Sequence, residues 1–273
     1  MADLQAQIEE LWEHRSEVEP GDRATKALIL EAVDLLDTGQ ARVAEVIGGR
    51  IVVHQWLKLA ILLLFRASKM KTIELGPFEY ADKVPLKKDY KDAGVRVVPG
   101  ASARYGSFLE RGVVLMPSYV NIGARVGRDT MVDTWATVGS CAQIGANCHL
   151  SGGVGIGGVL EPPQAAPVVV EDDCFIGSRS IVAEGARVGR GSVIGAGVIL
   201  TGSVPVIDAQ TGAEVGRGSV PPNSVVISAT RPRRFGNHEF GLPCALIIKH
   251  LSEGERHDKA RLESLLREHG ATV

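Results

Sequence analysis

Apolar residues recur at every sixth position through the centre of this chain. The pattern runs from residue 108 to residue 156, resumes from 170 to 206 after a break, and ends in a short fragment that begins at residue 215. The residue after each apolar position is usually small, as at Gly127, Gly139 and Gly145. The repeated positions are Phe108, Val114, Val120, Val126, Val132, Val138, Ile144, Leu150 and Ile156, then Val170, Ile176, Val182, Val188, Ile194, Leu200 and Val206, and finally Val215, Pro221 and Ile227.

This period is incompatible with the common regular structures. Six residues turn an α-helix by about 600°, so the apolar residues would spread around the helix axis. A flat strand repeats every two residues. Hexads in a row instead predict a parallel β-helix, in which each hexad forms one short strand and one corner and about three hexads close a triangular coil. The apolar residue of each hexad points into the prism, and stacked coils stabilise one another.

The hexads divide the chain into three expected parts. Residues 1–95 form an α/β cap, residues 96–228 the β-helix, and residues 229–273 a C-terminal segment of strand and helix. A cap is expected because an open coil end exposes unpaired strand edges. Two loops, at 158–167 and 207–214, interrupt the hexads and are candidates for function. The other expected elements are helices over 3–16, 23–37, 55–67 and 258–269, strands near 42–46, 50–53 and 245–248, and loops with short strands over 70–95.

Composition narrows the class of protein. A net charge of −2 and a pI of about 6.4 give no reason to expect a nucleic-acid or anionic membrane partner. The most apolar run, residues 57–65, is too short to span a bilayer. The four cysteines form no Cys-x-x-Cys pair, so we expect buried free thiols and a cytoplasmic protein.

Three residues of the repeat region are candidates for chemistry. Asp133 follows an inward apolar residue, where a carboxylate at a rigid corner can orient an amine or accept its proton, or can simply bind its own turn. His149 can act as a general base, although a hydrogen-bonding corner residue is the favoured interpretation. Since His149 is the only histidine of the repeat region, we expect no zinc site. Arg96 can pair with a substrate carboxylate or form a surface ion pair.

Several long motifs resemble one enzyme family. MPSYVNIGA at 116–124, MVDTWATVGSCAQIG at 131–145 and HLSGGVGIGGVLEP at 149–162 are similar to tetrahydrodipicolinate N-succinyltransferases, as are shorter matches from the cap to residue 249. The resemblance implies a left-handed β-helix and a metal-free cytoplasmic homotrimer with active sites between subunits. It implies transfer of succinyl from succinyl-CoA to the amine of opened tetrahydrodipicolinate, in lysine and diaminopimelate biosynthesis. In that family the residues that match Asp133 and Arg96 contact substrate, and the aspartate is the catalytic candidate.

The remaining site residues follow from this chemistry. We expect cationic partners for the dicarboxylate at Arg96, Arg179 and Arg104. Coenzyme A should lie along the prism, covered by the 158–167 loop and the C-terminal segment. The cluster Arg231, Arg233 and Arg234 can meet its phosphates or form a solvated basic face. Backbone N–H groups of the Gly-rich corners should bind the acyl-CoA and its oxyanion, at Ser151, Gly152, Gly153, Gly157 and Gly158.

One position departs from the family pattern. After the F-I-G-x-R-S motif the family usually carries a glutamate, whereas this chain has Ile181, with Glu184 three residues further on. This leaves open a related N-acyltransferase that uses acetyl-CoA or another amino-dicarboxylate acceptor. It also leaves open an inactive β-helix that serves as a scaffold or binding protein.

Overall fold

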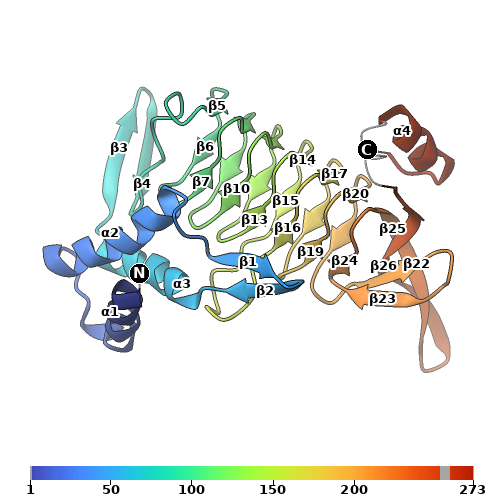
Figure 1. Ribbon diagram of the computed structural model, residues 1–273, viewed down its shortest axis with the longest axis horizontal. Helices are drawn as coiled ribbons and strands as arrows, with labels where there is room; N and C mark the ends of the chain where they lie inside the picture. The colour runs from blue at the N-terminus through green and yellow to red at the C-terminus, as the bar shows by residue number, and fades with distance from the viewer. Residues whose placement is uncertain (1, 253–258, 273) are drawn as a thin grey trace.

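The computed structural model describes residues 2–252 and 259–272, which form a prism with a helical cap at one end and a hairpin and helix at the other (Figure 1). The expected mainly β fold is confirmed, and the hexapeptide repeats form a left-handed parallel β-helix. None of the helices in the described ranges is both long and apolar enough to cross a membrane.

The cap is built from three helices and two small hairpins. The α2 helix is capped by the preceding residue, Asp22, whose side chain accepts a hydrogen bond from the Ala24 N–H. The α3 helix is apolar on most sides and packs between the other helices and the prism, where Ile122 and Cys141 join the cap core. The cap elements are α1 (Ala2–Glu13), η1 (Arg15–Glu17), α2 (Arg23–Asp37), β1 (Ala44–Ile47), β2 (Arg50–Val53), α3 (Gln55–Ala67), β3 (Lys71–Leu75) and β4 (Phe78–Asp82).

The prism has three faces of parallel two-residue strands. Face 1 consists of β7 (Phe108–Leu109), β10 (Arg125–Val126), β13 (Gln143–Ile144), β16 (Val169–Val170), β19 (Arg187–Val188) and β24 (Ser219–Val220). Face 2 consists of β5 (Arg96–Val97), β8 (Val114–Leu115), β11 (Met131–Val132), β14 (His149–Leu150), β17 (Phe175–Ile176) and β20 (Val193–Ile194), and continues into β25. Face 3 consists of β6 (Ser102–Ala103), β9 (Tyr119–Val120), β12 (Thr137–Val138), β15 (Gly155–Ile156), β18 (Ile181–Val182) and β21 (Ile199–Leu200).

The second residue of each strand points inward, and this corrects the expected register at both ends. From Val120 to Val206 the expected apolar residues are the buried ones. Before that, Leu109 and Leu115 are buried, and the expected Phe108 and Val114 face outward. The reason is a short corner with Pro117, because Val120 comes five residues after Leu115 in place of the usual six. At the other end Val220 and Val226 point inward, whereas the expected positions do not: Val215 is 46% exposed, Pro221 follows its strand, and Ile227 packs outside the prism core.

The C-terminal end is more regular than the sequence suggested. The 207–214 segment is mostly a hairpin of β22 (Pro205–Asp208) and β23 (Glu214–Arg217). The basic stretch and the expected strand at 245–248 belong to one long antiparallel hairpin, β25 (Ser224–Phe235) and β26 (His238–His250). The expected domain boundary after residue 228 lies within β25. The α4 helix (Lys259–Glu268) covers face 2 through Leu266; residue 258, in the expected helix, lies outside the described residues.

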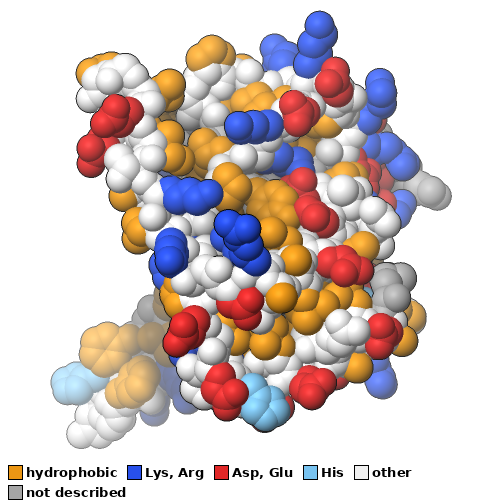
Figure 2. Space-filling view, turned by 90° about the vertical axis from the view of Figure 1, so that its left-hand side faces the viewer, with side chains coloured by type: hydrophobic (Ala, Val, Ile, Leu, Met, Phe, Trp, Pro, Cys, Tyr) orange, Lys and Arg blue, Asp and Glu red, His pale blue; other side chains and the backbone are white. Residues whose placement is uncertain are grey.

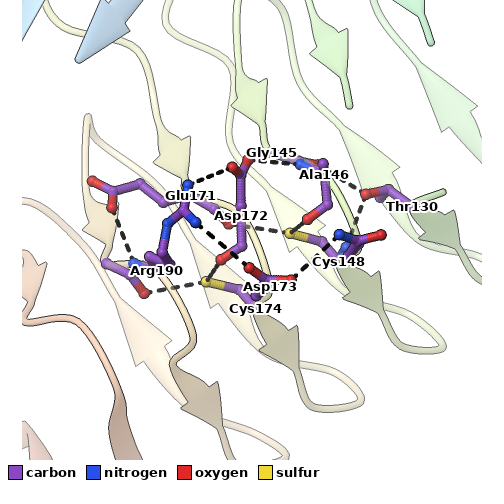
Figure 3. A network of polar contacts seen from close by, with 11 residues as sticks. Thr130, Gly145, Ala146, Cys148, Glu171, Asp172, Asp173, Cys174 and Arg190 are labelled. Atoms are coloured by element: carbon purple, nitrogen blue, oxygen red, sulfur yellow. Dashed lines mark hydrogen bonds and ion pairs between the residues drawn. The ribbon is translucent and has the colours of Figure 1, made fainter. Parts of the chain in front are cut away.

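Hydrogen bonds from one coil to the next hold the corner between faces 1 and 2 (Figure 3). The Thr130 hydroxyl donates to the Gly145 carbonyl and accepts from the Cys148 N–H, which lies on the next coil. The Cys148 thiol donates to the Glu171 carbonyl, and the Arg190 side chain pairs with Asp172. The expected buried thiols are confirmed, since none of the four cysteines forms a disulfide and all four are buried.

Candidate active site

Chemistry-bearing residues are stacked along the corner between faces 2 and 3, which we call corner 2–3. It consists of residues 133–135, 151–153, 177–179 and 195–197 in successive coils. The third residue of each segment has a positive φ, and two of the four are not glycine: Trp135 (φ 62°) and Arg179 (φ 61°). Residues other than glycine rarely have a φ in this range, and those that do are often retained for function.

Asp133 and His149 form a pair at this corner. The Asp133 Oδ2 lies 3.2 Å from the His149 Nε2, and both side chains are about one-third exposed. The other carboxylate oxygen accepts from the Thr134 N–H at 2.6 Å and the Thr134 hydroxyl at 3.2 Å. The His149 ring stands edge-on against Phe175, with centroids 5.3 Å apart, so its orientation is fixed from two sides.

The surroundings of Asp133 favour its ionised form. Burial acts to raise its pKa, but the hydrogen bonds from the Thr134 N–H, His149 and the Thr134 hydroxyl outweigh burial and lower the pKa below its ordinary value. A carboxylate with a lowered pKa is a weak proton acceptor and a good partner for a cationic group. This arrangement suits Asp133 to orienting His149 and stabilising the imidazolium that forms when the ring takes a proton.

Backbone hydrogen bonding narrows the set of N–H groups that can bind a ligand. Of the five expected residues, Ser151, Gly153 and Gly157 donate to carbonyls of neighbouring coils. Within the described parts of the chain, the N–H groups of Gly152 and Gly158 have no such acceptor. Gly152 lies on the coil next to Asp133, and a Cβ atom added to it would be 3.5 Å from the Thr134 carbonyl oxygen. Its N–H is therefore available beside the Asp133–His149 pair.

The three expected arginines lie in different places. Arg179 is exposed on corner 2–3, where its side chain lies over Gly153, and it has no carboxylate partner among the described residues. Arg96 is exposed on face 2, separated from His149 by β8 and β11, which places it about 14 Å away at the usual strand spacing. Arg104 lies instead on the corner between faces 3 and 1, where its guanidinium pairs with Asp82 at 2.5 Å and stacks over Phe65 of the cap.

The 158–167 loop lies on the other side of face 3 from Asp133. It is anchored to the cap by the buried Lys58, whose ammonium donates to the Ala165 carbonyl at 2.7 Å. Burial lowers the pKa of Lys58. Ile181 stands on face 3 between this loop and corner 2–3 and is 43% exposed, while Glu184 lies at the following corner. The expected glutamate position therefore holds an exposed isoleucine.

Asp133 lies outside the larger cavities that residues 2–252 and 259–272 form. A groove of about 610 Å³ lies between the β1–β2 hairpin and face 1, but its Arg125 and Arg187 side chains are already paired with Glu110 and Glu171. A small pocket of about 170 Å³ lies next to corner 2–3, lined by Tyr119, Trp135 and Thr137. Trp135 itself is 75% exposed. An open site with an exposed tryptophan is what one expects of a site completed by another molecule of the chain.

The sequence named Asp133, His149 and Arg179 as separate candidates, and the structure places all three on or beside corner 2–3. The contact between Asp133 and His149 was not predicted. The signal was present in the numbering, because His149 lies 18 residues after Met131, and a full coil of three hexads places it on the adjacent strand. Trp135 and the free N–H of Gly152 needed the structure, since only dihedral angles and hydrogen bonds distinguish them from other corner residues.

Comparison with known proteins identifies the family of this chain. The family described as "Tetrahydrodipicolinate N-succinyltransferase N-terminal" matches residues 3–67, and "Hexapeptide repeat of succinyl-transferase" matches residues 167–202. A protein of Methylorubrum extorquens (strain PA1) is 50% identical over 97% of this chain and 99% of its own length. Proteins of Methylobacterium sp. (strain 4-46) and Caulobacter vibrioides are 51% and 49% identical over 98% of this chain, and over 99% and 100% of their own lengths. All three are named 2,3,4,5-tetrahydropyridine-2,6-dicarboxylate N-succinyltransferase. The chain belongs to the tetrahydrodipicolinate N-succinyltransferase family of acyltransferases.

Proposed function

We propose that this protein transfers the succinyl group of succinyl-CoA to the amine of the opened form of 2,3,4,5-tetrahydropyridine-2,6-dicarboxylate, in lysine and diaminopimelate biosynthesis. The observation that carries the proposal is the Asp133–His149 pair beside the free N–H of Gly152. His149 can accept a proton, and the Gly152 N–H can donate a hydrogen bond to an oxyanion at the same corner. The chain also aligns with the named relatives over nearly its whole length.

The proton of the attacking amine passes to His149 in this mechanism. The neutral amine nitrogen bonds to the thioester carbonyl carbon, and His149 takes the proton that the nitrogen loses. Asp133 holds the ring through Nε2, so the ring nitrogen Nδ1 accepts the proton and the carboxylate stabilises the resulting imidazolium. The expected role of Asp133 thus becomes that of an orienting and charge-stabilising group.

The tetrahedral intermediate then breaks down and releases coenzyme A. The carbonyl oxygen becomes an oxyanion that the Gly152 N–H stabilises. The C–S bond breaks, the new C–N bond remains as an amide, and the coenzyme A thiolate receives the proton from His149. Removal of one such N–H donor typically lowers the rate by about 10²–10³-fold.

The cationic groups bind the two anionic partners. Arg179, at the same corner, is the first candidate for a substrate carboxylate, and Arg96 on face 2 is the second. Arg104 is a weaker candidate, because Asp82 already neutralises it. Coenzyme A extends from Gly152 along the prism toward the C-terminal end, where a groove of about 610 Å³ is lined by Arg231 and Arg233. Arg231 is paired with Glu214, so Arg233 is the first candidate for the phosphates.

We place the working enzyme in the cytoplasm as a homotrimer with its sites between copies. Four buried cysteines that form no disulfide suit a reducing compartment. The open Asp133 site and the exposed Trp135 and Ile181 support burial against a second copy. In such an assembly a residue from the next copy faces Asp133 in place of solvent.

The test is release of coenzyme A thiol from succinyl-CoA and, separately, from acetyl-CoA, with tetrahydrodipicolinate as acceptor. The expected result is rapid release from succinyl-CoA and at least tenfold slower release from acetyl-CoA. Faster release from acetyl-CoA would refute the assignment of succinyl-CoA as the donor. Acetyl-CoA is included because Ile181 replaces the usual family glutamate. No release with either donor would refute the proposed acyl transfer to this acceptor.

A further inference from the structure

A groove on face 1 lies away from the site of acyl transfer. It has a volume of about 610 Å³ and lies between the β1–β2 hairpin, which runs along this face in Figure 1, and the strands β10, β13, β16 and β19. Face 1 is opposite corner 2–3 in a three-sided prism, so the groove and the Asp133–His149 pair lie on opposite sides of the molecule. Its rim at the corner between faces 1 and 2 is formed by Gly145, Ala146, Glu171, Asp172 and Arg190 (Figure 3).

Ion pairs bound the groove at both ends. At one end Arg125 of β10 pairs with Glu110, and at the other end Arg187 of β19 pairs with Glu171. In both pairs the arginine is the outward residue of its strand, and the glutamate lies at the corner that follows face 1 in the preceding coil. The two coils between them interrupt this series, because glycine takes the place of the glutamate in both. Three strand spacings of face 1, about 14 Å, therefore lie between the two ion pairs.

Two further arginines line the end of the groove nearest β10, and neither has a carboxylate partner among residues 2–252 and 259–272. Arg128 is exposed at the corner that directly follows β10. Arg42 is partly buried just before β1, in a segment that lies over β10, since the Arg125 side chain donates to the Gly39 carbonyl at 3.4 Å. Burial and the nearby charge of Arg42 lower the pKa of Arg125. Two cations without a counter-charge at one end of a groove indicate an anionic ligand.

The floor of the groove supplies a hydrogen-bond acceptor. Gln143 lines the groove from β13, the strand next to β10, and is 6% exposed. Its amide nitrogen donates to the carbonyls of Gly123, Cys141 and Ala142 at the corner between faces 3 and 1, which leaves Oε1 on the side of the groove. This Oε1 is buried and has no hydrogen-bond partner within the described parts of the chain. Since buried acceptors are nearly always paired, we expect a ligand to supply the missing donor.

The two free arginines distinguish the groove from the rest of the surface. The chain has a net charge of −2, and basic and acidic side chains are interspersed over its cap end (Figure 2). Other charged groups that line the groove are paired locally: Arg190 with Asp172 at 2.7 Å, and Glu45 of the hairpin with His54 at 2.8 Å. An anion is therefore attracted to one end of the groove and not to the surface in general.

We propose that this groove binds a small dicarboxylate that also carries a hydroxyl or ammonium group. Two separate guanidiniums match two carboxylates, which pair with Arg42 and Arg128, while the hydroxyl or ammonium group donates to the Gln143 Oε1. The ligand joins the segment before β1 to the prism and stabilises the folded chain when it is bound. The groove is separate from corner 2–3, so this site goes beyond the proposed function and does not depend on it.

Titration calorimetry of the intact protein with L-malate and with succinate tests the site, because these dicarboxylates differ by one hydroxyl group. We expect L-malate to bind at least fivefold more tightly than succinate, since only malate can donate to Oε1. In the Gln143→Met variant the two acids should bind with equal affinity. Equal affinities in the wild type, or a preference for malate that persists in the variant, would overturn the proposal.

Arginine variants locate the binding in the groove. Arg42→Gln and Arg128→Gln should each weaken L-malate binding at least fivefold, because each removes the cation of one carboxylate. The matched control is Arg111→Gln: Arg111 is exposed at the equivalent corner position one coil nearer the cap, outside the groove, and its variant should bind malate as the wild type does. The same affinity in all three variants would contradict a site in this groove.

The Arg179→Gly variant distinguishes the groove from the acyl-transfer site, where a dicarboxylate is also expected. It should bind L-malate with the affinity of the wild type, because Arg179 lies at corner 2–3. Loss of malate binding in this variant would place the acid at corner 2–3 and overturn the proposal. Thiol release by the wild-type protein tests the other hypothesis separately: malate binding in the groove without turnover supports this site and refutes acyl transfer, and turnover without malate binding refutes only this site.

Discussion

Corner 2–3 shows a conflict between backbone preference and chemistry at single residues. Gly153 and Gly197 occupy the left-handed position in two coils, whereas the equivalent positions hold Trp135 and Arg179. A side chain at such a φ costs about 1 kcal/mol relative to glycine. The chain retains this strain at the two positions that flank the Asp133–His149 pair along the corner, which is what one expects of residues kept for function.

Replacement of Arg179 by glycine should separate stability from activity. We expect Arg179→Gly to leave the free energy of unfolding unchanged or to raise it by up to about 1 kcal/mol, because the strain is relieved. We expect kcat/KM for the dicarboxylate to fall at least tenfold, because a carboxylate loses its cation. Asp129→Gly is the matched control: it has a φ of 58° but lies at the corner between faces 1 and 2. It should show the same change in stability with normal activity. Equal loss of activity in both variants would contradict the role of Arg179.

The Asp133–His149 pair predicts both a rate effect and a pH effect. Asp133→Asn removes the charge that holds the imidazolium, so we expect kcat to fall by about 10²–10⁴-fold at neutral pH with the fold retained. The folded pKa of Asp133 is lowered, so its contribution to stability is complete above the ordinary value of about 3.9 and is lost as the pH falls through the lowered pKa. Urea unfolding should therefore find wild type more stable than the variant at pH 6, and the difference should shrink at pH 3. A constant difference would contradict the assignment.

At the scale of elements, the hexad spacing predicts the strands well in the middle of the prism and poorly at its two ends. The helices at 23–37 and 55–67 and every inward residue from Val120 to Val206 were predicted from spacing alone. The errors at Phe108, Val114 and the 215–227 fragment arise where one coil loses a residue or a hairpin is inserted. Spacing counts residues and cannot show where a corner is shortened. The length of β25 was also missed, because its second half, residues 230–235, contains Pro232 and three arginines and does not resemble an apolar strand.

Coil stacking makes some glycines necessary and others replaceable. A Cβ atom at Gly139 would lie 2.2 Å from the Gly158 backbone nitrogen, so the next coil must move. At Gly155 the nearest atom to an added Cβ is the Ile181 Cγ1 at 3.8 Å, an ordinary contact. We expect Gly139→Ala to lower the free energy of unfolding by about 3 kcal/mol and Gly155→Ala by less than about 1 kcal/mol, as measured in urea. Similar effects of the two substitutions would show that the coils adjust to each other more easily than the packing indicates.

At the scale of the whole molecule, one copy leaves too much of its functional surface open. Trp135, Ile181 and Ile199 are large apolar residues on or beside face 3, and Phe235 and Phe240 extend from the C-terminal end. The sequence could suggest the site through Asp133 and its motif, but it could not show that the site lies at an open corner. Exposure is a property of the folded surface, which residue spacing does not determine.

Sedimentation of the intact protein tests whether that surface is covered by copies of the same chain. The chain has a mass of 29.0 kDa, so a closed ring of three predicts about 87 kDa. Because a closed ring uses both contact surfaces of every copy, we expect a single species whose mass stays constant as the concentration rises. A mass of one chain would refute the assembly and leave the open corner without a partner. A mass that grows steadily with concentration would show that the copies form an open filament in place of a closed ring.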